Sequence, residues 1–468
     1  MVLWKGPLKI VTTGPLLGLQ LDRGQPLALQ VERWIRALVN SQTLPVGTRL
    51  PSTRALALDL GISRGVVVGA YAQLAAEGYI ELRRGASPAV AATGRAPEDV
   101  RVDPDVPIAR ARATCLPDFG FFPRRDWLAV TRTILQRARG GDFSYGEPFG
   151  AGALRLQLAP FLARTREVVA VPDRTAIFAG ATQALLALGS VLRAGGARRI
   201  AVEDPSHRWR RNTIAASGLE TVPVPVDEEG LRVDRIGDVS AVVVSPDHQF
   251  PLGVSLSPRR RRELVEWAAA EDALVIEHDY DVHFRYDQSR TGALQGLAPE
   301  HVAYVGSTSA LLAPAVRVGW GVLPARLVEP VAYNLFATAI GAPRLTQLAL
   351  AEFIARGYLD RHLRRTTTAF RKRRQALVEA LNRDLPQARL QGSAVGLYLS
   401  VALPDGVDEA KLLAGARRRG VALDGFDEHG VERHEPGLVL GFASAPEPTL
   451  AYAVELLADA WEEAVSRA

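Results

Sequence analysis

The stretch RLPSTRALALDLGISR, residues 49–64, decides the fold of the N-terminal part of the chain. Ser52 and Thr53 are residue types that cap helices, and they precede a short apolar run that ends at Gly61. Ser63 is placed to cap a second helix directly after that glycine. Two short helices with a glycine-containing turn between them are typical of a helix-turn-helix, so the stretch predicts that motif.

Apolar side chains on both sides of this stretch recur at helical spacing. One helix is predicted before it, over residues 27–40, and the second helix of the motif extends from Ser63 to about Gly78. Residues 79–85, YIELRRG, then indicate a strand with a basic tip, which completes a winged helix-turn-helix. The apolar positions of the two longer helices are Leu27, Val31, Trp34, Ile35, Leu38, Val67, Tyr71 and Leu74.

The excess positive charge of the chain lies in this N-terminal part. Residues 1–95 hold eleven basic and five acidic side chains, whereas the whole chain carries a net charge of only +5. A basic module of this kind predicts binding to double-stranded DNA, with the second helix of the motif in the major groove. The alternative is a small helical domain with solvated arginines. The expected DNA-contacting residues are Arg49, Ser52, Arg54, Ser63, Arg64, Arg83, Arg84 and Gly85.

Length and composition predict several domains. A chain of 468 residues exceeds one ordinary core, and we expect a winged helix over 1–85, an extended linker over 86–116 and a large domain over 117–468. Cys115 is the only cysteine, which excludes a disulfide framework and fits a reducing cytoplasm. No secretion signal or membrane-spanning stretch is recognisable, so a cytoplasmic location and no membrane partner are expected.

From Phe119 onward, short β-prone runs alternate with amphipathic helical stretches. This alternation predicts an α/β fold, in which helices cover both faces of a mostly parallel sheet. A smaller α+β subdomain is expected over about residues 360–468. A binding site is then expected at the carboxyl ends of the strands. The predicted strands begin at Ala176, Arg199, Ala241, Ala273 and Val302.

Polar sequences follow these strands in an ordered series. They are Gly180-Ala-Thr-Gln, Glu203-Asp-Pro-Ser-His207, Ser245-Pro-Asp-His, Glu277-His-Asp-Tyr280 and Gly306-Ser-Thr-Ser-Ala310. The series resembles that of fold-type I aminotransferases, the pyridoxal-phosphate (PLP) enzymes, and residues 49–64 resemble the GntR-type winged helix. Over nearly the whole chain, the sequence resembles the MocR/GabR regulators, which join these two parts.

The resemblance implies a cofactor site without the lysine that would bond PLP covalently. The family's lysine, which forms the aldimine, falls on Ala310, and the carboxylate at the pyridine nitrogen falls on His278. A shift of one residue in the alignment would place Asp279 there instead. The phosphate end of the site is retained, so PLP is implied at best as a non-covalent ligand. The implied pocket residues are Tyr145, Ala181, Thr182, His207, His278, Tyr280, Ser307, Ser309, Ala310 and Arg317.

These features predict a DNA-binding transcriptional regulator whose aminotransferase-like domain does not catalyse and forms a homodimer. Three possibilities are open for the pocket: PLP held without a covalent bond, another small anion, or no ligand. Two alternatives stand beside this hypothesis. One is a working PLP transaminase, against which Ala310 counts. The other is a protein whose large domain only dimerises, so that its DNA affinity does not respond to any metabolite. No metal site is predicted.

Overall fold

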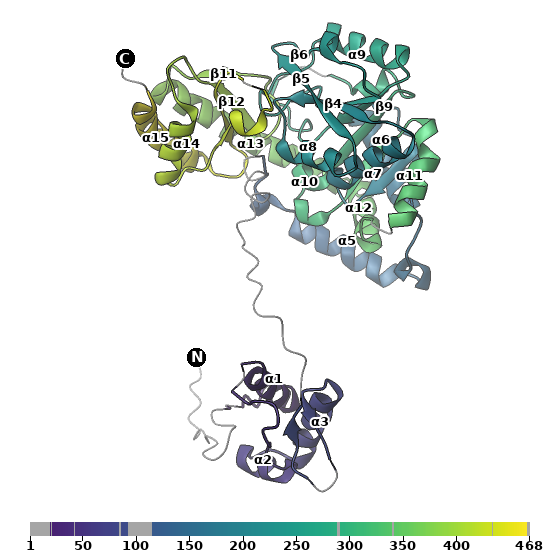
Figure 1. Cartoon of the computed structure of the whole chain (residues 1–468), viewed down its shortest axis with the longest axis vertical. Helices are drawn as coiled ribbons and strands as arrows, with labels where there is room; N and C mark the ends of the chain where they lie inside the picture. Colours follow the sequence, from purple (N-terminus) through teal and green to yellow (C-terminus); the bar gives the residue numbers. More distant parts are fainter. Residues whose placement is uncertain are drawn as a thin grey trace. The chain divides into compact units, whose positions relative to one another are not determined.

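The chain divides into two compact units, Met1–Pro104 and Asp105–Ala468. The computed structural model describes residues 19, 21–41, 43–83, 86–91, 115–287, 291–338, 341–432 and 434–465. Figure 1 shows the first unit as a small helical body and the second as a larger body in which helices pack on a central sheet. Within the described ranges, no helix combines the length and apolar composition needed to cross a membrane.

The first unit is a three-helix fold with the predicted helix-turn-helix at its centre. The hydroxyl of Ser52 accepts a hydrogen bond from the backbone N–H of Ala55, and Gly61 ends the helix in the left-handed region at a φ of 65°. Ser63 precedes the next helix, but its side chain makes no capping hydrogen bond, so the predicted cap is wrong in that detail. The helices are α1 (Leu27–Asn40), α2 (Thr53–Leu60) and α3 (Arg64–Ala76), and their buried core includes Val31, Ile35, Leu56, Val67, Tyr71 and Leu74.

The predicted wing is a small antiparallel ribbon. Strand β1 (Ile80–Glu81) pairs with β2 (Ala89–Val90), with Ile80 opposite Val90. The expected domain end at residue 85 falls between these two strands, because no sequence pattern indicates so short a second strand. Arg84 and Gly85, both expected to contact DNA, lie outside the described residues.

The second unit is built on an eight-stranded sheet in the order β3-β10-β9-β8-β7-β4-β5-β6. Neighbouring strands from β9 to β5 are parallel, whereas β10 runs antiparallel to both β9 and β3. The predicted mostly parallel sheet is therefore confirmed. The strands are β3 (Thr175–Phe178), β4 (Arg199–Asp204), β5 (Glu220–Asp227), β6 (Gly230–Leu231), β7 (Ala241–Val244), β8 (Leu274–His278), β9 (Val302–Ser307) and β10 (Gly319–Val322).

Both faces of this sheet are buried, because alternate side chains of each strand point to opposite sides. Ala241 and Val243 pack in one core with the helices α7 and α8, whereas Val242 and Val244 pack in another with α9. The helices of this unit that precede the smaller subdomain are α5 (Arg124–Arg137), α6 (Gly152–Arg166), α7 (Ala181–Ala194), α8 (Arg208–Ala215), α9 (Pro258–Ala270), α10 (Thr308–Leu311), α11 (Ala325–Thr338) and α12 (Arg344–Ala355).

The C-terminal part forms the expected smaller subdomain (Figure 1). Its four-stranded sheet has the order β11-β12-β14-β13 and is antiparallel throughout. Three helices pack with it, and the first of them, at 27 residues, is the longest in the described chain. The elements are β11 (Arg389–Gln391), β12 (Tyr398–Ala402), β13 (Asp424–Gly425), β14 (Gly437–Gly441), α13 (Tyr358–Asp384), α14 (Glu409–Arg418) and α15 (Glu447–Ala464).

A buried network of ion pairs connects several segments around the large sheet. The guanidinium of Arg166 bonds Asp247 and lies 2.6 Å from Asp279, and Arg261 bonds the other oxygen of Asp247. The hydroxyl of Tyr304 donates to Asp279 at 2.7 Å. Although burial acts to raise it, the nearby Arg166 holds the pKa of Asp279 below its ordinary value. We call this group the Arg166 network.

Candidate effector cavity and DNA-binding surface

A small cavity lies at the carboxyl ends of the parallel strands, where the sequence predicted a site. Its volume is about 110 Å³, below the range of about 300–1,000 Å³ typical of pockets for drug-sized ligands. It collects all but one of the predicted pocket residues. Its lining is Cys115, Leu116, Gly180, Ala181, Thr182, His207, Trp209, His278, Tyr280, Ser307, Ser309, Ala310, Pro314 and Arg317.

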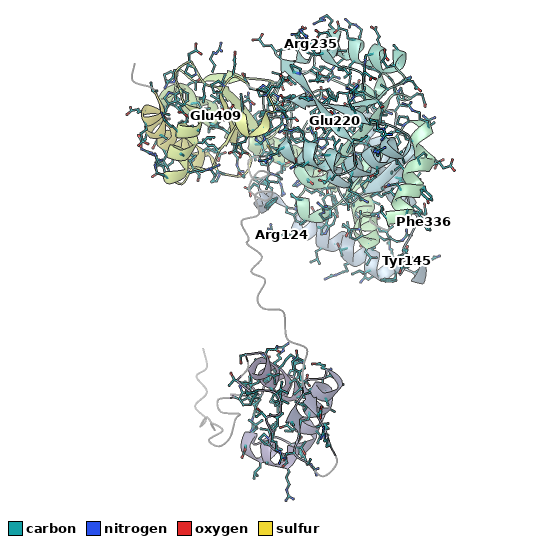
Figure 2. All side chains as sticks on the ribbon, in the orientation of Figure 1. Arg124, Tyr145, Glu220, Arg235, Phe336 and Glu409 are labelled. Atoms are coloured by element: carbon teal, nitrogen blue, oxygen red, sulfur yellow. The ribbon has the colours of Figure 1, made fainter. Side chains whose placement is uncertain are left out.

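Tyr145 is the exception. It lies outside this lining, its side chain is fully exposed, and Figure 2 shows it at the periphery of the larger unit. The short segment that carries it follows a 3-10 turn, Gly140–Phe143, rather than a strand of the sheet. Within the described part of a single chain, the structure does not bring Tyr145 to the cavity.

One end of the cavity presents the start of α7 and a guanidinium. The backbone N–H groups of Ala181 and Thr182 open the helix, where they have no acceptor within it. Arg317 holds a left-handed backbone conformation at a φ of 53°, which is strained for any residue except glycine and is often found at ligand sites. Its guanidinium lies beside Gly180. A helix N-terminus next to an arginine is an arrangement that binds anions.

Two glycines allow this end of the cavity to form. Gly180 has a φ of 110° and a ψ of 171°, a conformation that side chains exclude. Gly319 lies so close to it that a Cβ atom on Gly319 would approach the Gly180 backbone to 2.7 Å. The β10 strand can therefore run against the helix start because Gly319 lacks a side chain, and Gly180 supplies the backbone conformation from which the helix begins.

His278, not Asp279, is the residue that β8 directs into the cavity. Leu274 and Ile276 belong to the core under α7 and α8, and His278 follows them on the same face of the strand. Asp279 points to the other side, into the Arg166 network. Of the two residues between which the sequence alignment could not decide, only His278 lines the cavity.

Arg210 fixes the orientation of the His278 ring. It is fully buried, and its guanidinium lies 3.0 Å from Glu203, 2.8 Å from the hydroxyl of Ser245 and 3.2 Å from Nδ1 of His278. Burial raises the pKa of Glu203, although the neighbouring guanidinium acts to lower it. Because arginine can only donate, Nδ1 of His278 is the acceptor of this hydrogen bond.

Aromatic rings form the floor beside His278. The ring of His207 stacks on Phe250 at 3.5 Å between centroids and an angle of 6°. The hydroxyl of Tyr280 donates to that of Tyr398 at 3.0 Å, and burial raises the pKa of Tyr280 well above its ordinary value. The Tyr280 hydroxyl is therefore neutral and already bonded within the protein.

Five residues of the wall are not among the predicted pocket residues, although one of them, Gly180, begins a polar sequence that follows a predicted strand. Trp209 and Pro314 come from α8 and from the turn after α10, and nothing in the local pattern distinguished them. Cys115 and Leu116 were assigned to the end of the linker. Their apolar character was the only signal that this end packs against the large unit, where Cys115 contacts the cluster around Phe250.

The described lysine side chains are distant from this wall in sequence and are not part of it. The chain contains four lysines, and Lys5 and Lys9 lie outside the described residues. Lys372 and Lys411 are exposed on α13 and α14. At the described positions that line the cavity, no lysine occurs, and Ala310 contributes a methyl group that is 5% exposed.

The helix-turn-helix presents its arginines to solvent. Arg49, Arg54 and Arg64 are exposed, and the guanidinium of Arg64 reaches the hydroxyl of Thr53 at 3.4 Å, so it lies at the junction of α2 and α3. Arg83 on the wing is paired with Glu81 at 2.9 Å, in an ion pair that is open to solvent. Such an exposed pair is weak and is readily exchanged for a phosphate.

The outer face of α3 is made mostly of small side chains. Gly65, Val68, Gly69 and Ala72 are exposed along it, and Gln73 is bonded to Glu77 at 2.8 Å. A smooth helix of this kind can approach the floor of a groove closely, but it offers few groups that read base edges.

Two family matches divide the chain in the same way as its two units. Residues 122–456 match the family described as aminotransferase class I and II, and residues 27–90 match the bacterial regulatory proteins of the gntR family. Similar solved structures include an archaeal alanine:glyoxylate aminotransferase, at 25% identity and a TM-score of 0.69, covering 74% of this chain and 89% of that chain.

Curated relatives extend over both units. The HTH-type pyridoxine biosynthesis transcriptional regulator PdxR of Corynebacterium glutamicum is 31% identical over 456 residues, covering 95% of this chain and 98% of the relative. The probable rhizopine catabolism regulatory protein MocR of Rhizobium meliloti is 27% identical, covering 95% of this chain and 96% of the relative.

Proposed function

Because the chain belongs to the aminotransferase class I and II family and carries a gntR-family region, we propose that it is a transcriptional regulator without transaminase activity. Its relatives include an HTH-type transcriptional regulator of pyridoxine biosynthesis and a probable regulatory protein of rhizopine catabolism, and gntR-type regulators bind DNA. The proposal concerns the finer points: which residues contact DNA, and what the aminotransferase-like unit does.

The observation that carries the proposal is the wall of the cavity. Members of this family normally bind PLP, and transamination needs a lysine amine that bonds the aldehyde of PLP and a carboxylate that keeps the ring nitrogen protonated. The described wall offers neither a lysine nor a carboxylate, and this supports the alignment that puts Ala310 at the lysine position and His278 at the carboxylate position. Together with the small volume, this donor set does not fit PLP as transaminases use it. Only the end of the cavity formed by Arg317 and the start of α7, which can bind an anion, fits the phosphate of PLP.

An absorbance experiment tests this part of the proposal. Purified protein mixed with PLP is expected to show no borohydride-sensitive band of a lysine adduct, and no exchange of amino groups between amino and keto acids. Ala310→Lys restores an amine at that point, and we expect a coloured adduct if the rest of the wall admits the ring. A matched control is Ala315→Lys, on the exposed turn nearby. Transamination by the unaltered protein would overturn the proposal.

For DNA, we propose that Arg64 reads a base at the N-terminal end of α3, while Arg49, Arg54 and the wing arginines contact phosphates. Ser52 and Ser63 stand at the starts of the two helices and add hydroxyls to the same surface. Arg64→Ala should weaken specific binding by about 1–3 kcal/mol. Arg33→Ala removes the same charge from the exposed side of α1 and should change binding less. Footprints and affinities of the two variants, measured at the same salt concentration, show whether Arg64 contributes more to specific binding than Arg33.

We also propose that the protein acts as a homodimer, with the large domain from residue 117 onward as its dimerising part and with residues up to about 90 as the DNA-binding part. A two-fold dimer binds paired half-sites, so an operator with two similar halves is expected. Light scattering of the full chain, free and bound to its operator, measures this directly. A single protomer on a complete operator would contradict it.

A further inference from the structure

Val68 is an exposed apolar side chain on the outer face of α3. It is 45% exposed and does not belong to the core of the smaller unit. A β-branched residue also forms helices less well than alanine. Neither packing nor helix stability therefore accounts for a valine at this position. The residues that bury the opposite face of the helix are Val67, Ala70, Tyr71 and Leu74.

The glycine that follows Val68 is not required by the fold of the unit either. Gly69 lies in the interior of α3, where glycine destabilises a helix relative to alanine. It is not among the glycines with a positive φ, and a Cβ atom built on it would meet no atom within 4 Å. The unit itself could therefore hold a side chain here, whereas a partner that approaches the helix backbone closely could not.

Few groups on the outer face of α3 extend toward a partner. Arg64 is exposed at the first turn, and the side chain of Gln73, near the other end, is bonded to Glu77. Between Arg64 and Gln73, Val68 is the only exposed residue whose side chain is larger than a methyl group. Arg64 and Val68 are therefore the side chains that extend from the first two turns of this face.

The partner of this face is the major groove of DNA. Residues 27–90 match the gntR family, whose regulators bind DNA, and the second helix of a helix-turn-helix lies in that groove. Base pairs present hydrogen-bond donors and acceptors there, and thymine adds an apolar group, its C5 methyl. A valine makes no hydrogen bond to a base edge, so the thymine methyl is the group that Val68 fits.

We propose that Val68 packs on the C5 methyl of a thymine and makes this base a determinant of specificity. Gly69 allows the backbone of α3 to come close enough for that contact. Arg64 and Val68 lie about 6 Å apart along the helix axis, so the thymine lies within about two base pairs of the base that Arg64 reads. The inference rests on the proposed function, because it takes α3 as the helix that reads the bases.

Replacement of thymine by uracil tests the contact, because it removes only the methyl group. The probe is a duplex that the full chain selects from a random-sequence library, with each thymine replaced in turn by deoxyuridine. At one thymine of each half-site, the dissociation constant should rise about fourfold, as expected for one buried methyl group. The same site should lie within about two base pairs of the position at which Arg64→Ala relaxes the base preference.

Val68→Ala assigns the effect to the side chain. The variant should bind the thymine and uracil duplexes equally, with the affinity that the unaltered protein has for the uracil duplex. Alanine is the better helix former and the position is exposed, so the variant should fold. Val46→Ala is the matched control, because it removes the same atoms from a valine that is 64% exposed on the turn between α1 and α2. It should keep the full preference for thymine.

Gly69→Ala separates a role in binding from a role in folding. Alanine should increase the free energy of unfolding of the smaller unit, because the structure has open space for its methyl group. The same methyl group should weaken binding to the thymine and uracil duplexes by about fivefold or more, as overpacking of a close contact does. Chemical denaturation and affinities of one preparation measure both effects.

Three results would overturn the inference. They are a selected duplex in which no thymine is sensitive to uracil, a preference for thymine that persists in Val68→Ala, and unchanged DNA affinity of Gly69→Ala. If Arg64→Ala still weakens specific binding in these experiments, only the thymine contact is lost. If the full chain selects no sequence at all, the proposed function is lost with it.

Discussion

Replacing Arg210 by methionine should destabilise the larger unit strongly, because it leaves Glu203 buried without its counter-charge. Both side chains are essentially inaccessible, at 0% and 2% exposure. Removing one partner of such a pair costs about 3–5 kcal/mol in the free energy of unfolding. The substitution also removes the hydrogen bonds to Ser245 and His278.

The loss should depend on pH in a defined direction. Burial raises the pKa of Glu203, and Arg210 opposes that rise, so the variant has a still higher pKa. A carboxyl whose pKa in the folded state exceeds the unfolded value favours folding below the unfolded pKa and loses that contribution as the pH increases. The deficit of Arg210→Met should therefore be smaller at pH 5 than at pH 8, by at most about 1.4 kcal/mol for each unit of pKa increase.

Scanning calorimetry of the full chain measures this, because the larger unit unfolds with the greater enthalpy. The double variant Glu203→Gln/Arg210→Met removes both charges and should recover most of the loss. Arg259→Met, which breaks exposed ion pairs with Glu229 and Glu263, should cost about 0–1 kcal/mol. The reasoning is refuted if Arg210→Met costs less than about 1 kcal/mol at pH 8, or if the double variant is less stable than the single one.

Three further outcomes are expected from buried polar groups and from backbone conformation. Tyr71→Phe should cost about 1–3 kcal/mol in the smaller unit, because its hydroxyl donates to the carbonyl of Pro51 at 2.9 Å; chemical denaturation measures this. Gly180→Ala should destabilise the larger unit by about 1–3 kcal/mol through its backbone conformation, and an unchanged melting temperature would contradict this. Burial raises the pKa of Glu277 to about 7, so its contribution to stability should fall as the pH rises from about 4.5 to 7, and Glu277→Gln should flatten that fall in urea unfolding curves.

In the large sheet, the sequence predicted the five strands that bury continuous apolar runs and missed β5, β6 and β10. In β5, Pro223 and Pro225 argue against a strand. The carbonyl of Pro225 accepts from Arg232, so the position of its missing N–H faces β6 and not the parallel partner β4. In β10, two of the four residues are glycines, which carry no β signal, and one of them, Gly319, is required by the close approach to Gly180.

The candidate cavity was largely predictable because its residues follow strands, and the carboxyl ends of parallel strands meet. The sequence does not show to which side of the sheet a residue at the end of a strand points. His278 and Asp279 are adjacent and both polar, and only the alternation of β8 separates the cavity from the Arg166 network. The partner of His278, Arg210, is 68 residues away in the chain. Its role depends on tertiary packing that no local pattern encodes.

The Arg166 network has a consequence for how far the residues of the cavity can change. Its charged members, Arg166, Asp247, Arg261 and Asp279, lie outside the cavity lining, so these ion pairs do not depend on the residues of the cavity. Substitutions at the cavity can therefore accumulate without loosening the frame. A fold whose stabilising ion pairs lie outside its binding site can keep its structure when the residues of that site change.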